Sequence, residues 1–118
     1  MSLADESILD TTKKNLGVAD DVTVFDVDIL THINSVFFTL NQIGVGPSEG
    51  FMIQDKQAKW SDYIGGDLNL NVVKTYIYAR VRVLFDPPTT SFAIDALKKE
   101  TEEFEWRLQA YMDGVLNP

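Results

Sequence analysis

The chain has 118 residues, of which 45% are hydrophobic and 24% charged, and its formal net charge is −8 at pH 7. This length fits one domain, and the composition is that of a globular protein rather than a disordered one. Cysteine is absent, which excludes disulfides, thiolate metal sites and a thiol nucleophile, and no apolar run approaches the roughly 20 residues of a membrane helix.

The first predicted helix covers residues 5–16. Ile8, Leu9, Thr12 and Leu16 fall on one side at helical spacing, and Gly17 is placed to end the helix in a left-handed conformation. A polar linker then leads to the second predicted helix.

That second helix is predicted to begin at Asp26, whose carboxylate would act as the N-cap. Phe25 and Leu30 flank its first turn as a hydrophobic staple. The apolar side chains that follow recur at helical spacing: Ile29, Ile33, Val36, Phe37, Leu40 and Ile43. Four glycines and prolines in residues 44–50 end the helix.

Residues 44–66 form an irregular insertion. Phe51 and Ile53, and then Ala58 and Trp60, alternate at period two, so a small hairpin is one open alternative for this segment. Asp67 follows two glycines and is predicted to cap the next helix.

Residues 68–85 carry two overlapping patterns. Every second residue from Val73 to Phe85 is apolar or β-branched, as in a strand, but Val73, Tyr76, Ile77 and Val81 also form a helical stripe. A strand of that length would far exceed the usual five or six residues, so the segment is predicted to be helical.

The dipeptide Pro87-Pro88 predicts a rigid corner, because neither proline can donate the amide that would continue the helix. Thr89 or Thr90 is then placed to cap a last helix, and Gly114 to end it. One face of this helix shares apolar character: Ile94, Leu97, Thr101, Phe104, Leu108 and Tyr111.

The sequence therefore predicts an all-α fold, a small bundle of about four helices with the irregular insertion between its second and third long helices. We expect a single domain over residues 1–118, with residues 1–4 and 115–118 flexible.

No motif predicts chemistry. His32 is the only histidine and has no nucleophile or metal partner within one helical turn. Asp26 and Asp28 lack the glycine and glutamate of a calcium loop, and the glycine pairs do not run into a Gly-Lys-Ser/Thr helix start. We predict no catalytic residue, no cofactor and no metal site.

The acidic charge is concentrated in residues 1–55, which hold nine acids and two bases. Such a surface repels phosphate and disfavours nucleic-acid binding, although solubility is the simpler explanation. Lys74, Arg80 and Arg82 beside two tyrosines could mimic a basic–aromatic strip, but core packing and ion pairing explain them better.

Seven short motifs follow one another along the chain: Asp26-x-Asp28-Ile29, His32-Ile33-Asn34, Leu40-Asn-Gln-Ile-Gly-Val-Gly-Pro47, Gly50-Phe51, Trp60-Ser61-Asp62, Val81-Arg82-x-Leu84-Phe85-Asp86-Pro87-Pro88 and Phe104-Glu105-Trp106-Arg107-Leu108. Together they resemble the small head–tail connector (adaptor) proteins of tailed bacteriophages, over about residues 8–108. The resemblance implies a non-enzymatic, mostly helical protein made in the bacterial host cytoplasm and located at the virion head–tail junction.

The same resemblance implies partners. Copies of the chain would form a ring, twelvefold in the virion, beneath the portal protein, and the ring would dock a tail or stopper protein. DNA would pass through without specific binding, and no membrane is involved. The alternative is a helical interaction or regulatory module of prophage or bacterial origin.

A ring needs two different patches on each subunit, and exposed aromatic side chains are good candidates for them. We predict Phe51, Trp60, Tyr63 and Trp106 as subunit or partner interface residues. For the first three, and for Trp60 above all, the alternative is a mini-core folded over the second helix.

Overall fold

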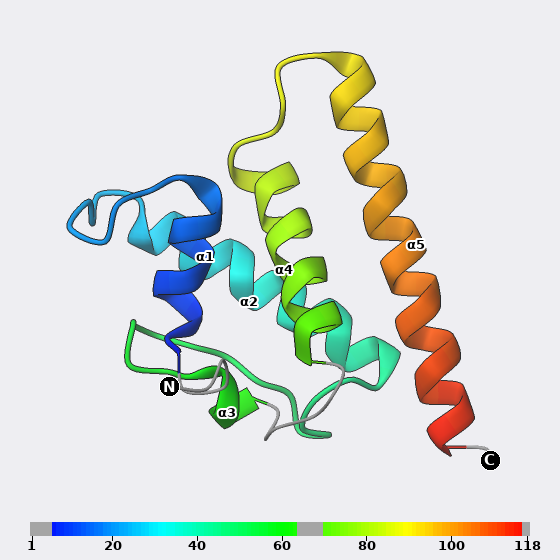
Figure 1. Cartoon of the computed structure of the whole chain (residues 1–118). Helices are drawn as coiled ribbons and strands as arrows, with labels where there is room; N and C mark the ends of the chain where they lie inside the picture. The colour runs from blue at the N-terminus through cyan, green and yellow to red at the C-terminus, as the bar shows by residue number, and fades with distance from the viewer. Residues whose placement is uncertain (1–5, 64–69, 117–118) are drawn as a thin grey trace.

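The computed structural model describes residues 6–63 and 70–116, and after the gap it describes the side chains of residues 71–114 (Figure 1). These residues form five helices: α1 (Ile8–Leu16), α2 (Asp26–Ile43), α3 (Trp60–Tyr63), α4 (Leu70–Phe85) and α5 (Ser91–Leu116). The all-α prediction is confirmed. The predicted cap Asp67 and the terminal residues 1–4 and 117–118 lie outside the described part of the chain.

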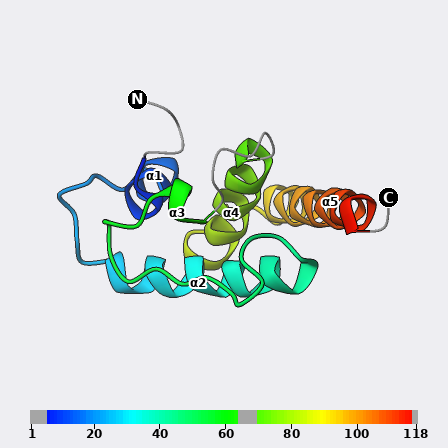
Figure 2. The same cartoon turned by 90° about the horizontal axis from the view of Figure 1, so that it is seen from below.

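Helix α4 is the centre of the bundle. It packs against α2 on one side and α5 on another, and α1 contacts both α2 and α4. Figures 1 and 2 show α1 and α5 at opposite ends of the molecule, with α2 running beneath α4 and α3 lying beside the start of α1. The molecule is elongated, with extents of 44 × 35 × 25 Å.

Helix α1 begins at Ile8 rather than at residue 5, because Ser7 is extended (φ −64°, ψ 133°) and its hydroxyl accepts from the Asp10 amide at 3.2 Å. The predicted end at Gly17 is confirmed. Its φ of +80° allows its amide to donate to the last carbonyls of the helix.

The prediction that Asp26 caps α2 is wrong. Phe25 occupies the cap position without a side-chain hydrogen bond, and the Asp26 carboxylate lies 2.9 Å from Lys13 Nζ instead. Lys13 is 99% buried and also donates to the carbonyls of Asp20 and Val22. A buried ammonium needs several partners, so this requirement directs Asp26 away from the helix amides and fastens the α1–α2 turn.

The hairpin alternative for the insertion is also wrong within the described residues. Residues 51–54 are irregular and pair with no strand, and one isolated bridge joins Ser7 to Lys59. The amide and the carbonyl of Ile53 pair instead with the Asn34 side chain of α2.

The helical prediction for residues 68–85 is confirmed from Leu70 onward. Thr90 caps α5, since its hydroxyl accepts from the Ala93 amide at 3.2 Å. The helix continues to Leu116, so the prediction that Gly114 ends it is wrong. In the last turns of α5 the buried side also differs from the predicted apolar stripe, which ended at Tyr111. Met112 is half-buried there, whereas Tyr111 is 46% exposed.

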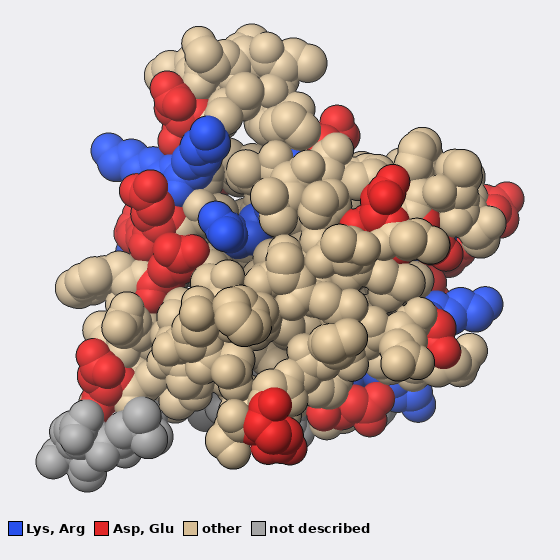
Figure 3. Space-filling model, turned by 180° about the vertical axis from the view of Figure 1, so that it is seen from behind, with Lys and Arg blue, Asp and Glu red and all other residues tan. Residues whose placement is uncertain are grey.

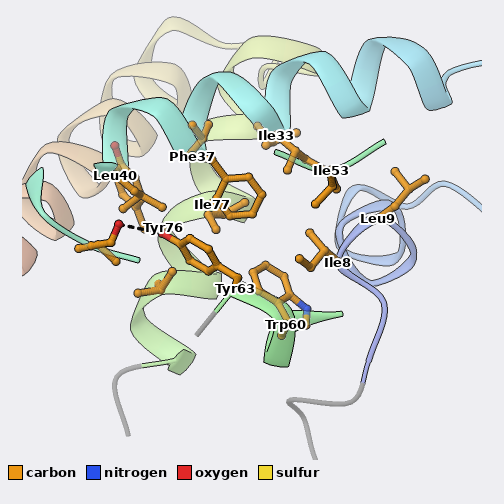
Figure 4. Packing of buried hydrophobic residues seen from close by; sticks show 14 of the residues in the cluster. Ile8, Leu9, Ile33, Phe37, Leu40, Ile53, Trp60, Tyr63, Tyr76 and Ile77 are labelled. Carbon is orange, nitrogen blue, oxygen red and sulfur yellow. Dashed lines mark hydrogen bonds between the residues drawn. The ribbon is translucent and has the colours of Figure 1, made fainter. Parts of the chain in front are cut away.

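One hydrophobic core joins all five helices and the insertion (Figure 4). The buried members are Ile8, Leu9, Ile29, Ile33, Val36, Phe37, Leu40, Val45, Ile53, Trp60, Tyr63, Val73, Tyr76, Ile77, Val81 and Leu108. Among the described side chains of α5, only Leu108 is a buried member of this core, so α5 is attached to one side of the core rather than wrapped by it. None of the described helices is both long enough and apolar enough to span a membrane.

Candidate interaction surface

Three of the four aromatic residues predicted for an interface come together inside the chain. The Tyr63 ring packs against Phe37 of α2 and against Phe51, with centroid separations of 4.6 and 5.0 Å. Tyr63 is 4% and Trp60 0% exposed, and Phe51 is half-buried. Figure 4 shows Trp60 and Tyr63 directed from α3 into the core. The mini-core alternative therefore describes their side chains.

Trp60 joins α3 to α1 and α4. Its Nε1–H donates to Thr11 Oγ1 at 3.0 Å, Lys74 Nζ lies 5.2 Å from the ring centroid, and the Tyr78 ring lies edge-on at 6.2 Å. A tryptophan whose ring is buried and whose donor is satisfied stabilises the fold that contains it.

Two asparagines of α2 hold the insertion in place. Asn34 accepts from the Ile53 amide and donates to the Ile53 carbonyl at 2.8 and 2.9 Å, and Asn41 donates to the Pro47 carbonyl at 3.1 Å. Gly46 has a φ of +85°, and a Cβ there would lie 2.5 Å from the Tyr63 ring. Asn34 belongs to one of the sequence motifs described above, and Asn41 and Gly46 belong to another. These contacts therefore give both motifs a structural role.

The buried tyrosines carry no proton chemistry at neutral pH. Burial raises the pKa of Tyr63, and burial together with the hydrogen bond to Glu105 raises that of Tyr76. Burial is also the largest cause of the raised pKa of Tyr78. The Tyr76 hydroxyl donates to the carboxylate of Glu105 on α5, and this carboxylate lies 4.0 Å from Arg80 Nε. Glu105 therefore links α5 to two side chains of α4.

His32 lines an open groove of about 570 Å³ between the α1–α2 turn and the end of α4. Its ring lies edge-on to Phe85 at 6.4 Å, and Asp28 and Asp86 lie at the rim. Among the described residues, no serine, threonine or cysteine lines this groove, and they hold no cluster of three or more metal-ligating side chains. The groove offers packing rather than chemistry.

Exposed apolar side chains gather at one end of the molecule, on the α1–α2 turn and the start of α2. Val24 is 76% exposed, Val27 74% and Phe25 42%. We call these three residues the turn patch. Sequence reasoning missed it, because the helical stripe of α2 accounts for its buried side chains and leaves the exposed ones unremarked.

A second group lies at the opposite end, on the side of α5 that faces away from α4. Phe92 is 85% exposed and Trp106 71% exposed. We call these two residues the α5 face. Figures 1 and 2 show no described segment on that side of α5. Trp106 was predicted as an interface residue and is placed where a partner can reach it, whereas Phe92 was not singled out.

Charge is unevenly distributed on the surface. On the face shown in Figure 3, acidic side chains are spread around the margin and the basic ones form small separate groups. No continuous basic strip crosses this face, so it lacks the pattern that follows a nucleic-acid backbone. Lys74, for which the sequence favoured core packing and ion pairing over such a strip, is 93% buried beside Glu6.

A family model described as phage connector protein matches residues 8–115. The chain belongs to the phage connector protein family. A connector of this family is a structural phage protein rather than an enzyme, and membership implies a place at the head–tail junction of the virion. Comparison with curated proteins and with solved structures found no match.

Family membership gives the two exposed patches a context. A connector acts by contact with other head and tail components, and the turn patch and the α5 face are the apolar surfaces that its described residues leave uncovered at the two ends. The groove beside Asn34, lined by Phe38 and Met52, is a third apolar feature of about 400 Å³.

Proposed function

We propose that this connector protein forms a ring between the portal and the tail or stopper of a tailed phage, twelvefold in the virion, and that the ring extends the DNA channel. The whole chain, residues 1–118, acts as one domain in that ring. The observation that carries the proposal is the position of two dissimilar apolar patches at opposite ends of an elongated subunit.

A ring requires a heterologous contact, in which one patch of each subunit meets a different patch of the next. The turn patch offers two valines and a phenylalanine, and the α5 face offers Phe92 and Trp106. Aromatic side chains dominate binding energy at interfaces, and these two are already held on a rigid helix. Head-to-tail docking of the two patches therefore supplies a contact that repeats around a ring.

The acidic first half of the chain fits a conduit for DNA. Residues 1–55 carry nine acids against two bases, and Lys13, one of the two, is buried in an ion pair. Fixed negative charge repels the phosphate backbone, so DNA is expected to slide past without specific binding. Affinity for duplex DNA at low salt would be weak on this account, and tight binding would contradict it.

Electron microscopy of the chain mixed with its portal protein tests the ring. We expect twelvefold rings with the unchanged chain and their loss with Val27→Asp or Phe92→Asp, one substitution in each patch. Phe38→Asp is the matched control, because Phe38 is 65% exposed but lies on neither patch. Rings that survive both patch substitutions, or a chain that never binds the portal, would overturn the proposal.

A further inference from the structure

The outward side of α5 carries a regular row of exposed residues. Phe92, Ala96, Lys99, Glu103, Trp106 and Ala110 are all exposed. They are separated by four, three, four, three and four residues. This is the spacing of a helix seam that packs along a second helix, with side chains of one helix entering the gaps of the other. The inner side of α5, through Thr101 and Leu108, is already occupied by the bundle.

The row is also complementary to itself when reversed. Lys99 and Glu103 lie two residues on either side of Thr101, and they carry opposite charges. Ala96 and Trp106 lie five residues on either side of the same point, so a small side chain mirrors a large one.

The outermost pair of the row also matches a large side chain with a small one. Phe92 and Ala110 lie nine residues on either side of Thr101, again a large side chain and a small one. Three pairs thus match in charge or in size about one centre. A face selected only for contact with solvent has no reason to be complementary in this way.

We propose that two free copies of the chain dock α5 against α5, antiparallel, about a twofold axis beside Thr101. In this pairing Trp106 of each copy covers Ala96 of the other, Phe92 covers Ala110, and Lys99 faces Glu103. Such a contact is isologous, so each pair occurs twice and the contact closes at two subunits. The pairing covers Phe92 and Trp106, the two most exposed large apolar side chains of α5 among the described residues.

The contact is small. The paired segment spans 18 residue steps, or about 27 Å at 1.5 Å per residue, and two helices pack about 8–10 Å apart. The buried area therefore falls at the low end for protein interfaces, below about 1,200 Å². Dimerisation is expected to be reversible, with a dissociation constant of roughly 1–100 µM.

The inference goes beyond the ring and does not require it. If the ring contact uses the α5 face, the dimer must open before a ring closes, so the pairing keeps free copies from assembling away from the portal. The dimer is measured on the free chain alone, so its failure and the failure of the ring are distinguished.

Sedimentation velocity over a concentration series tests the pairing. We expect the mass to rise from the 13.3 kDa of one chain to twice that value. Lys99→Glu or Glu103→Lys should weaken dimerisation about tenfold or more, because each places like charges opposite one another twice. The double variant should restore it. Lys98→Glu is the matched control, since the neighbouring lysine is exposed but lies off the row.

A steric variant separates this pairing from a merely sticky surface. Ala96→Trp would place two indoles opposite each other and should abolish the dimer, whereas on a non-specific apolar patch an added tryptophan would strengthen association. Ala96 is exposed in the monomer, so circular dichroism should show an intact fold. A monomer at every concentration, a double charge variant that stays monomeric, or stronger association of Ala96→Trp would each overturn the proposal.

Discussion

The two tryptophans of the chain give a matched pair for testing the division between core and surface. Trp60 is 0% exposed and Trp106 is 71% exposed. Replacement of Trp60 by alanine removes a fully buried ring and the hydrogen bond from its Nε1–H to Thr11 Oγ1. Replacement of Trp106 by alanine removes a side chain that contacts mainly solvent.

The expected magnitudes differ widely. Truncation of a buried tryptophan costs about 3–5 kcal/mol, and the lost hydrogen bond about 1 kcal/mol more. Since a domain has only about 5–15 kcal/mol of total stability, Trp60→Ala should lose a large part of it. Trp106→Ala should stay within about 0.5 kcal/mol of the unchanged chain.

Urea denaturation of both variants, followed by far-ultraviolet circular dichroism, measures the difference. Each variant retains one tryptophan, so fluorescence gives an independent transition for the remaining site. Trp60→Phe serves as an intermediate case, because it keeps an apolar ring but removes the donor to Thr11. Equal losses for the two alanine variants would refute the assignment of Trp60 to the core and Trp106 to a partner surface.

Three further outcomes follow from the contacts. Gly46→Ala should destabilise the chain by more than Gly50→Ala in thermal melts, because both positions have positive φ but only the Cβ at Gly46 would collide with Tyr63; similar melting temperatures would contradict this. Lys13→Met should cost about 2–4 kcal/mol in urea denaturation, since it leaves two carbonyls and the Asp26 carboxylate without their donor, and an unchanged midpoint would count against the role of the buried ion pair. The tyrosines should leave the free energy of unfolding unchanged below about pH 10. Above that pH the free energy of unfolding should fall, because burial raises the pKa of Tyr63 in the folded chain above its ordinary value of 10.0. Tyr63→Phe should reduce this fall, as measured by denaturation at pH 8 and pH 11.

The helices were predictable because local signals agreed with one another. The stripe of α2 from Ile29 to Leu40 and the left-handed stop at Gly17 depend on residues close in sequence, and both appear in the structure. The choice of helix over strand for residues 70–85 followed from length alone. Where local signals are enough to define a helix, the sequence predicts the helix and often the residue at which it ends.

Two of the errors, the Asp26 cap and the hairpin, share a different cause, because each involves a partner far away in the sequence. The Asp26 carboxylate could cap a helix, but it forms an ion pair with Lys13, thirteen residues earlier, instead. The alternating apolar residues near Ile53 suggested a hairpin, yet the Ile53 amide and carbonyl bond to Asn34 of α2. A local pattern shows what a residue can do and not which distant group competes for it.

The candidate site was only partly predictable, because contacts distant in the sequence decide which aromatic side chains are buried. An aromatic residue outside a helical stripe is either an interface residue or part of a satellite core, and sequence spacing does not separate the two. Trp106 lies on a helix with a clear inner stripe, so its exposure followed from α5 itself. Trp60 lies in an irregular segment, and its burial depends on α1 and α4 closing around it.

The motifs that carry the family resemblance are mostly internal to the fold. Asn34 and Asn41 fasten the insertion, and Trp60 fills the core. Such residues are constrained by the chain itself, so they identify a connector without describing what it touches. Val24, Val27 and Phe92 belong to no motif and are exposed by 74% or more. Partner specificity is therefore to be sought at these exposed positions, and substitutions there should change assembly while leaving the melting temperature unaltered.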